Sequence, residues 1–372
     1  MEEQELARLR AEIDATDHQL LKTLKRRQEL AAEIGRVKRK LGQPLYVPAR
    51  ERQLIAARRQ EARAQGLSEQ LIEDVLRRAM RESYQQQQAS DEHLSGRVIA
   101  IIGGAGALGS LFHRLFTGAG ARVMIIEKDD WAQLSEAEQL DLVLFATPIA
   151  QTPELITQLP ELPDSCVLAD LTSIKEQPLQ QMLAQHQGPV VGLHPMFGPQ
   201  LNHLAKQLIV VCHGRQQPAY QWLLDAFQRW GAHLQEVSAK QHDAAMAFVQ
   251  MLRHLSTFVY GRHLAQEQVD IAQLIALSSP IYRLEMMMVG RLFAQNPELY
   301  ADIILANKSH FVMIKRYLET FTEVLDQLER GERSDFIEAF EQVHQFFGDY
   351  AEQFLAESQH LLDAAGDAHQ VG

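Results

Sequence analysis

The stretch Val98–Gly109, which reads Val-Ile-Ala-Ile-Ile-Gly-Gly-Ala-Gly-Ala-Leu-Gly, decides the fold of the middle of the chain. Its five leading apolar residues are typical of a buried strand, and the glycines follow at the spacing of a dinucleotide-binding loop. Glycines let the backbone approach a pyrophosphate, and the helix that opens after them directs N–H groups and a positive dipole end toward it. A tight strand-to-helix turn without a ligand is the alternative. The candidate cofactor-binding residues of the loop are Gly104, Gly106, Leu108 and Gly109.

An acidic residue at the end of the next expected strand, 122–127, supports a cofactor. Glu127 can accept hydrogen bonds from the ribose hydroxyls of adenosine and would repel a 2′-phosphate, so NAD is favoured over NADP. Thr147, Pro148 and Ser173 each follow a further expected strand. Because ligands of doubly wound folds bind beyond the carboxyl ends of strands, we expect these residues to face the nicotinamide end. Ordinary strand termination explains each of them equally well.

The wider pattern predicts a multidomain protein. From residue 97 short β-rich runs alternate with helical ones, which is typical of a parallel sheet wrapped by helices. The expected strands are 98–102, 122–127, 141–146, 166–170 and 190–193, followed by 208–212 and 233–237 on either side of a helix at 222–230. Beyond Ser238 the pattern is helical, with breaks at Pro280, Pro297 and Gly331. We therefore expect an all-α domain at 1–90, an α/β Rossmann-type domain at 91–238 and an all-α domain at 239–372.

A histidine ends the expected strand 190–193 and begins a loop that two prolines stiffen. His194 would lie where the nicotinamide ends, and a neutral imidazole there can accept a proton from a carbinol as hydride leaves. A purely structural histidine is the alternative. The residue is therefore a candidate catalytic base.

Two arginines, Arg283 and Arg291, lie eight residues apart on a very apolar helix at 281–293. They project from similar sides of the helix and need an anion, either Glu285 or a substrate carboxylate. His254 lies beside Arg253 in another apolar helix and is also either a ligand-binding residue or a structural one. A structural role is favoured for this histidine.

The first forty residues predict one long amphipathic helix. Residues 4–41 contain no proline, and their apolar positions recur at three-and-four spacing. At 1.5 Å per residue the helix would be ~55 Å long, more than a module of ~90 residues can cover alone, so we expect a partner chain. Two further helices are expected, from Pro48 to before Gly66 and from the N-cap Ser68 to about Gln87, before a polar linker at 85–92.

Cations interrupt the apolar stripe of this helix at Arg27 and Lys38, which lie ~17 Å apart on one face. Cations that point into a helical core must be paired or hold an anion, so a dicarboxylate could be bound between them; extension into solvent is the alternative. Arg10 lies ~26 Å from Arg27 and would have to come from the partner chain to share that ligand. Polar residues of the two neighbouring helices can complete the site: Arg50, Glu51, Ser83 and Gln87.

Composition bounds the class of protein. No apolar run approaches the ~20 residues that span a bilayer, and the N-terminus lacks a signal-peptide pattern, so we expect no membrane segment. Cys166 and Cys212 lie in apolar runs, which excludes a disulfide framework or Cys-rich metal site and fits the cytoplasm. Net charge is −12: residues 1–90 carry 18 Lys and Arg against 14 Asp and Glu, and the remainder 18 against 34. The acidic bulk argues against nucleic acid as a partner.

Taken together, these residues resemble a known family over nearly the whole chain. The N-terminal part is similar to an all-helical chorismate mutase and the remainder to prephenate dehydrogenase, in the order of the bifunctional chorismate mutase/prephenate dehydrogenases of tyrosine biosynthesis. The match rests on Leu9–Asp14, Val37–Lys38, Val47–Arg52, Gly192–Pro199 and Ser278–Glu285.

The resemblance implies a homodimer in which Arg10 of one chain joins residues of the other around chorismate: Arg27, Lys38, Arg50, Glu51, Ser83 and Gln87. It further implies that His194 accepts the proton of the prephenate hydroxyl with support from Ser173, and that Arg291 binds a substrate carboxylate. The cofactor is NAD, no metal is needed, and tyrosine is an expected feedback inhibitor with His254 a possible contributor. Many single-function helical mutases have an acidic residue where Val47 stands, so one accessory contact is absent.

Two other functions stay open on the residues alone. A different NAD enzyme, such as a 3-hydroxy acid dehydrogenase with N-terminal helices that only dimerise, would pair Arg27 and Lys38 with protein carboxylates. A regulatory dimer that senses an aromatic amino acid would show no turnover, but the complete glycine loop and the intact His194 loop speak against it.

Overall fold

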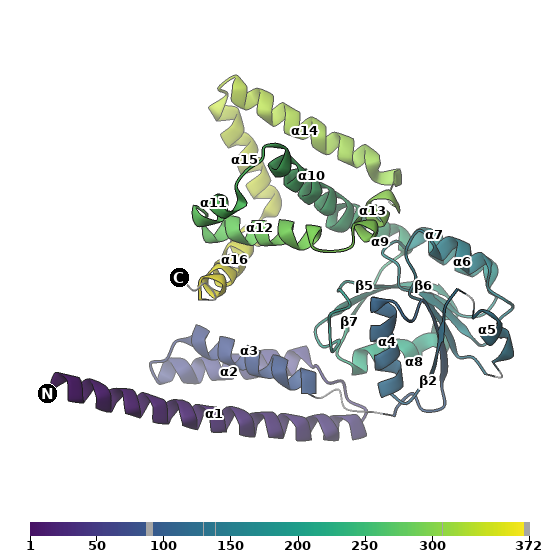
Figure 1. The fold of residues 1–372 in the computed structure, drawn as a ribbon, viewed down its shortest axis with the longest axis horizontal. Helices are drawn as coiled ribbons and strands as arrows, with labels where there is room; N and C mark the ends of the chain where they lie inside the picture. Colours follow the sequence, from purple (N-terminus) through teal and green to yellow (C-terminus); the bar gives the residue numbers. More distant parts are fainter. Residues whose placement is uncertain (87–91, 129, 138, 307, 368–372) are drawn as a thin grey trace. The chain divides into compact units, whose positions relative to one another are not determined.

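A computed structural model of the chain describes residues 1–86, 92–128, 130–137, 139–306 and 308–367. The chain forms two compact units, which divide between His242 and Asp243. Figure 1 shows the first unit as three N-terminal helices followed by a sheet wrapped by helices, and the second as a group of helices. The predicted class, helical domains on either side of a Rossmann-type domain, is confirmed.

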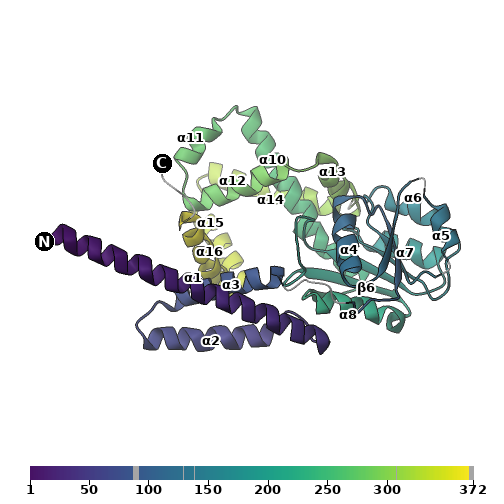
Figure 2. The same ribbon diagram turned by 60° about the horizontal axis from the view of Figure 1, so that its bottom comes forward.

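The three N-terminal helices are α1 (Glu2–Lys40), α2 (Pro48–Ala64) and α3 (Glu69–Gln86). The two predicted helix starts are confirmed. Pro48 is the first residue of α2, and the Ser68 hydroxyl accepts a hydrogen bond from the Leu71 N–H at the start of α3. The helices α1 and α2 each pack on α3 (Figures 1 and 2). Gly35 is the one buried residue of α1. The apolar stripe of this helix is exposed in the single chain: Ile13 is 60% exposed and Ile34 is 56% exposed.

A seven-stranded sheet, in the order β2-β1-β3-β4-β5-β6-β7, forms the middle of the chain. All neighbours pair in parallel except β5 and β6, which are antiparallel and are joined without a helix. The predicted strands are present, with ends that differ by up to three residues, and the first five are parallel as expected. Their bounds are β1 (Val98–Ile102), β2 (Arg122–Ile126), β3 (Leu142–Phe145), β4 (Val167–Asp170), β5 (Val190–Pro195), β6 (Leu208–Arg215) and β7 (His233–Glu236).

Helices cover both faces of this sheet. One face packs on α4 (Ala107–Gly118) and α8 (Gln221–Arg229) through a core of aromatic and aliphatic side chains that includes Phe112, Phe116 and Phe227. The other face packs on three shorter helices, α5 (Ala132–Glu136), α6 (Thr152–Thr157) and α7 (Glu176–Gln185). Both sides of the central strands are therefore dry, which explains why their sequences are apolar without alternation. The 3₁₀ turn η1 (Gln217–Tyr220) leads into α8.

The helical remainder of the chain begins with α9 (Ala239–Met246) and a π-helical turn η2 (Ala247–Leu252). The predicted breaks are confirmed, because Pro280 and Pro297 each begin a helix and Gly331 separates two. The helices are α10 (Arg253–Gln266), α11 (Ile271–Ala276), α12 (Pro280–Phe293), α13 (Pro297–Ala306), η3 (Lys308–His310), α14 (Phe311–Glu329), α15 (Arg333–Phe347) and α16 (Asp349–Asp367). Within the described ranges, no helix combines the length and apolar composition that crossing a bilayer requires.

Candidate functional site

The glycine loop between β1 and α4 is built so tightly that side chains would not fit. Gly103 has a φ of +78°, which favours glycine, and a Cβ on it would lie 3.0 Å from the Ala146 carbonyl oxygen. A Cβ on Gly109 would lie 2.3 Å from the Gly103 carbonyl oxygen. Gly106 precedes the first residue of α4. This close backbone turn at a helix N-terminus is the geometry that receives a pyrophosphate.

The charges around the loop also fit a dinucleotide. The first turn of α4 contains no acidic residue of its own. Glu127 follows β2, and its Oε1 accepts a hydrogen bond of 2.9 Å from the Ala105 N–H. Thr147 follows β3, next to Gly103, and its hydroxyl is 2.8 Å from that of Thr152. The predicted acid therefore lies at the glycine loop, where it can receive ribose hydroxyls.

His194 is buried in β5, with 4% of its surface exposed. Its Nδ1 lies 2.8 Å from Nε2 of His242 in α9. Burial, and then the charge of Lys175 and the neighbouring His242, lower the pKa of His194 well below the usual histidine value. The imidazole is thus neutral at pH 7, the form that a general base requires.

A buried ion pair ties the loop after β4 to the strand of His194. Lys175 Nζ contacts Asp170 Oδ2 with both side chains fully buried, and it also donates a hydrogen bond of 2.8 Å to the Leu193 carbonyl oxygen. Asp170 Oδ2 accepts the Thr172 N–H at 3.0 Å as well. Ser173 lies in this loop, and among the described residues its buried Oγ has no hydrogen-bond partner. The loop therefore presents a hydroxyl that can serve a ligand.

The predicted anion-binding arginine of the second unit, Arg291, lies on the exposed side of α12. Arg283, one of the two candidates, is partly exposed on the same helix. His254 packs edge-on against Tyr300 with ring centroids 4.9 Å apart, and burial followed by the charge of Arg253 lowers its pKa.

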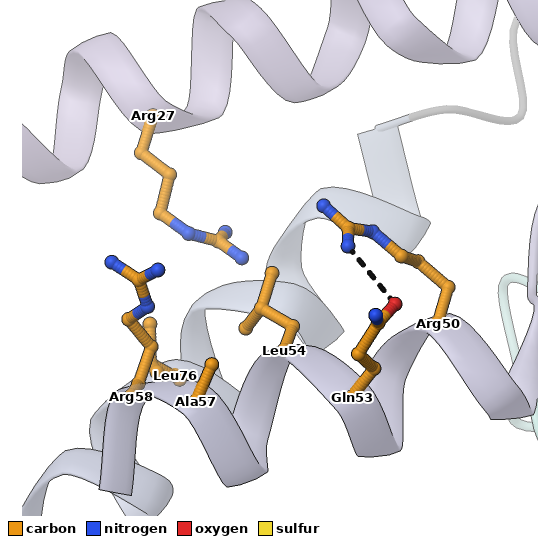
Figure 3. Close-up of a pocket in the computed structure, with 7 residues that line it drawn as sticks. All are labelled: Arg27, Arg50, Gln53, Leu54, Ala57, Arg58 and Leu76. Atoms are coloured by element: carbon orange, nitrogen blue, oxygen red, sulfur yellow. Dashed lines mark hydrogen bonds between the residues drawn. The ribbon is translucent and has the colours of Figure 1, made fainter. Parts of the chain in front are cut away.

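A second cluster of cations lies among the N-terminal helices. A pocket of about 340 Å³ is lined by Arg27 of α1, by Arg50 and Arg58 of α2, and by apolar residues that include Leu54 and Leu76. Figure 3 shows the three guanidinium groups pointing into the space between α1 and α2. Three cations on an apolar floor form a site for a small anion that carries more than one negative charge.

The other described candidate residues of this region do not line the pocket, but Ser83 contacts one of its arginines. Arg27 Nη1 donates a hydrogen bond of 3.3 Å to the buried Ser83 hydroxyl. Lys38 Nζ donates to the Leu45 carbonyl oxygen at 3.0 Å, and burial lowers its pKa. Glu51 is buried on α2 and contacts Arg77, Tyr84 and Lys206. Arg10 is exposed on α1, and Gln87 and most of the predicted linker lie outside the described residues.

Several residues that line the pocket or contact the candidate residues are not among those predicted from the sequence. Arg58 follows Arg50 by eight positions and could have been found by helical spacing. His242 is one of 15 histidines in an ordinary polar helix, so nothing in its neighbourhood marks it. Lys175 belongs to a stretch that the prediction places near the cofactor, without a role of its own. Lys206 lies 155 residues from Glu51, and local patterns carry no signal for such a pair.

Family models match three parts of the chain. Residues 9–88 match chorismate mutase type II. Residues 118–235 match the nucleotide-binding domain of prephenate dehydrogenase, and residues 238–342 match its dimerization domain.

Whole-length relatives carry the same combination. The chain is 51% identical to the T-protein of Enterobacter agglomerans over 98% of its own length and 99% of the relative's, and 46% identical to that of Haemophilus influenzae over 97% of each. A crystal structure of A. aeolicus prephenate dehydrogenase with hydroxyphenyl propionate and NAD⁺ has the same fold, with a TM-score of 0.55, 16% identity and coverage of 67% of this chain and 96% of that one.

The cofactor and both substrates follow from these matches and from the geometry above. A glycine loop with its acidic neighbour suits NAD, an arginine pocket suits the dianion chorismate, and a buried neutral histidine suits the oxidation of prephenate. The chain therefore belongs to the T-protein family, the bifunctional enzymes of tyrosine biosynthesis that rearrange chorismate to prephenate and oxidise prephenate with NAD⁺.

Proposed function

We propose that the pocket between α1 and α2 is the mutase site and that its arginines hold the two carboxylates of chorismate. The observation that carries this proposal is the convergence of Arg27 and Arg50 on one apolar cavity. The rearrangement is pericyclic and needs no covalent intermediate, so catalysis consists of holding the compact conformer and stabilising charge on the breaking ether oxygen. Lys38 and Gln87 are the donors proposed for that oxygen, and Ser83 orients Arg27.

Glu51 has a different role, because it is a carboxylate and cannot attract a dianion. The hydroxyl of chorismate is the only hydrogen-bond donor of the dianion, and a fixed carboxylate is a strong acceptor for it. We assign Glu51 to this hydroxyl.

The mutase site is proposed to be shared between the two chains of a homodimer. The open apolar stripe of α1 supports this assembly, because the described residues of the single chain leave Ile13 and Ile34 more than half exposed. Arg10 lies about 26 Å along the helix from Arg27 and would reach the pocket of the partner rather than its own. The second unit, which matches a dimerization domain and exposes Phe321 and Phe340, is proposed to add to the same interface.

The dehydrogenase site is proposed to lie where β1, β3, β4 and β5 end. Gly104, Gly106, Leu108 and Gly109 would hold the pyrophosphate of NAD, Glu127 the ribose hydroxyls, and Thr147 and Pro148 the nicotinamide end. Bound NAD⁺ supplies the hydride acceptor. The support is the glycine loop, which a Cβ would fill, together with the acid beside it.

His194 is proposed to accept the proton of the prephenate C4 hydroxyl while a hydride leaves C4 and the ring carboxylate departs as CO₂. We assign the Nδ1 proton of His194 to the contact with His242, and in that tautomer Nε2 is the accepting atom. Ser173 adds a second hydrogen bond to the hydroxyl. Arg291 is proposed to bind a substrate carboxylate.

Further proposals follow from the family. We place the domain boundaries at 90 and 238, in agreement with family-model matches that end at 88 and begin at 238. Tyrosine is the proposed feedback inhibitor, with His254 as one contributor. A cytoplasmic location is supported by two buried cysteines that form no disulfide.

A coupled assay tests the whole proposal. The purified protein is given chorismate, whose loss is followed by ultraviolet absorbance, and NAD⁺ is then added while NADH is recorded. Both signals are expected. Chorismate loss without NADH would overturn the assignment of the second site, and NADH from added prephenate alone would reduce the N-terminal helices to a dimerisation element.

A further inference from the structure

One ion pair joins the sheet domain to the N-terminal helices. Lys206 Nζ lies 2.5 Å from Glu51 Oε1, and the side chain of Glu51 is only 6% exposed. A carboxylate removed from water to this degree needs compensating charge, because its desolvation is otherwise costly. Lys206, which belongs to the sheet domain, therefore supplies positive charge that stabilises the buried Glu51 carboxylate.

The position of Lys206 is set by the sheet domain. Its backbone has a φ of +66°, and its N–H donates a hydrogen bond of 2.9 Å to the Gly231 carbonyl oxygen, just before β7. The two residues before it, Leu204 and Ala205, are buried in the core of the sheet domain. The ammonium group is thus carried by a turn that the sheet holds in place, and Nζ also lies 5.3 Å from the ring centroid of Tyr46.

The remaining contacts of Glu51 do not use all the acceptor positions of its carboxylate. Oε1 also receives Arg77 Nη1 at 3.3 Å, and Oε2 receives the Tyr84 hydroxyl at 3.2 Å. Burial, followed by the charge of Glu51, raises the pKa of Tyr84, so the phenol keeps its proton and remains a donor. A carboxylate offers about four acceptor positions, and these three donors fix its plane without exhausting them.

A second contact between the same two parts reaches Lys38. The loop between α1 and α2 is anchored to the sheet domain where the Leu45 N–H donates to the Arg229 carbonyl oxygen at 3.2 Å. Lys38 Nζ donates to the carbonyl oxygens of Leu45 and Pro44, at 3.0 and 3.3 Å. Two proposed mutase residues are therefore linked to the sheet domain by separate contacts.

We propose that Lys206 is a positioning residue of the mutase reaction: it holds Glu51 in the orientation that receives the chorismate hydroxyl, so the dehydrogenase domain completes the mutase site. This inference rests on the proposed role of Glu51. It makes the mutase depend on a side chain that the dehydrogenase reaction does not use.

The test compares variants of the full-length protein. A displacement of ~1 Å in a catalytic group can cost about 100-fold, and since Arg77 and Tyr84 remain, we expect Lys206→Met to lower mutase kcat/KM about tenfold. Lys206→Arg, which keeps the cation, is expected to restore most of it. Oxidation of added prephenate should be unchanged in both variants. Lys240→Met, which removes an exposed lysine of the same compact unit, is the matched control and should leave the mutase unchanged.

A double-mutant comparison separates this role from general stabilisation. In a Glu51→Gln background, Lys206→Met should cause no further loss, because the group through which it acts is already altered. An unchanged mutase in Lys206→Met, or an equal tenfold loss in the Glu51→Gln background, would overturn the inference. If Lys206→Met unfolds the protein, Lys206→Gln takes its place with the same two criteria. A Glu51→Gln protein with full mutase activity would instead overturn the proposed role of Glu51.

Discussion

The imidazoles of His194 and His242 meet at 2.8 Å, Nδ1 to Nε2, with ring planes inclined by 71°. One of these two nitrogens must donate and the other accept. If His194 donates from Nδ1, its Nε2 carries the lone pair that can accept a proton, and His242 decides whether the base has the useful tautomer.

His242→Phe is accordingly expected to lower the dehydrogenase kcat by about 100-fold, since a misplaced tautomer removes general-base catalysis worth 10²–10⁴-fold. Mutase activity should be unchanged. The measurement is NADH formation from prephenate at saturating substrate, with His233→Phe, an exposed histidine of β7, as the control. Equal kcat values for His242→Phe and the wild type would contradict the proposed tautomer.

The pH dependence of the dehydrogenase follows from the lowered pKa of His194. The base is active when neutral, and a lowered pKa extends the neutral form to lower pH. We therefore expect kcat/KM for prephenate to fall on the acid side only below pH 6.5, the ordinary histidine value. A pH-rate profile in constant ionic strength measures this, and an acid limb centred above 6.5 would mean that the base is paired with an anion.

Gly109→Ala should weaken NAD binding, because its Cβ would lie 2.3 Å from the Gly103 carbonyl oxygen and push the loop away from the pyrophosphate. We expect the KM for NAD⁺ to rise about tenfold or more, given that a 1 Å displacement is felt strongly. Gly118→Ala provides the control in the same helix, since its Cβ meets nothing within 4 Å. Similar KM values for the two variants would argue against this loop as the cofactor site.

Lys38→Gln should abolish most mutase turnover and spare the oxidation of prephenate. The amide cannot supply the positive charge that stabilises the ether oxygen, a loss of roughly 10²–10³-fold for one such donor. Chorismate consumption without NAD⁺ is the measurement, and Lys22→Gln, on the exposed surface of α1, is the control. Retained turnover would remove Lys38 from the site.

The helices and strands can be predicted from the sequence more accurately than the pairing between distant strands. β1 lies at its predicted residues because five apolar residues end at a glycine loop, and α2 begins at Pro48 because proline suits a first helical position. The antiparallel partner of β5 was not anticipated, since strand direction depends on a connection whose sequence has no marked pattern.

For the candidate sites as well, residues marked by a local pattern can be predicted, and contacts between distant residues cannot. Arg27 and Lys38 are marked as site residues by an apolar stripe that they interrupt, a local pattern. The Glu51–Lys206 and His194–His242 contacts join residues 155 and 48 positions apart, so only the folded chain brings them together.

The N-terminus of α4 has a consequence for the stability of the folded protein. The glycine loop lies at the positive end of α4, which favours the negatively charged pyrophosphate of a dinucleotide. A ligand that binds only the folded state at 100 times its Kd adds about 2.7 kcal/mol of stability. Resistance to heat and to proteolysis should therefore rise with the concentration of dinucleotide added to the protein.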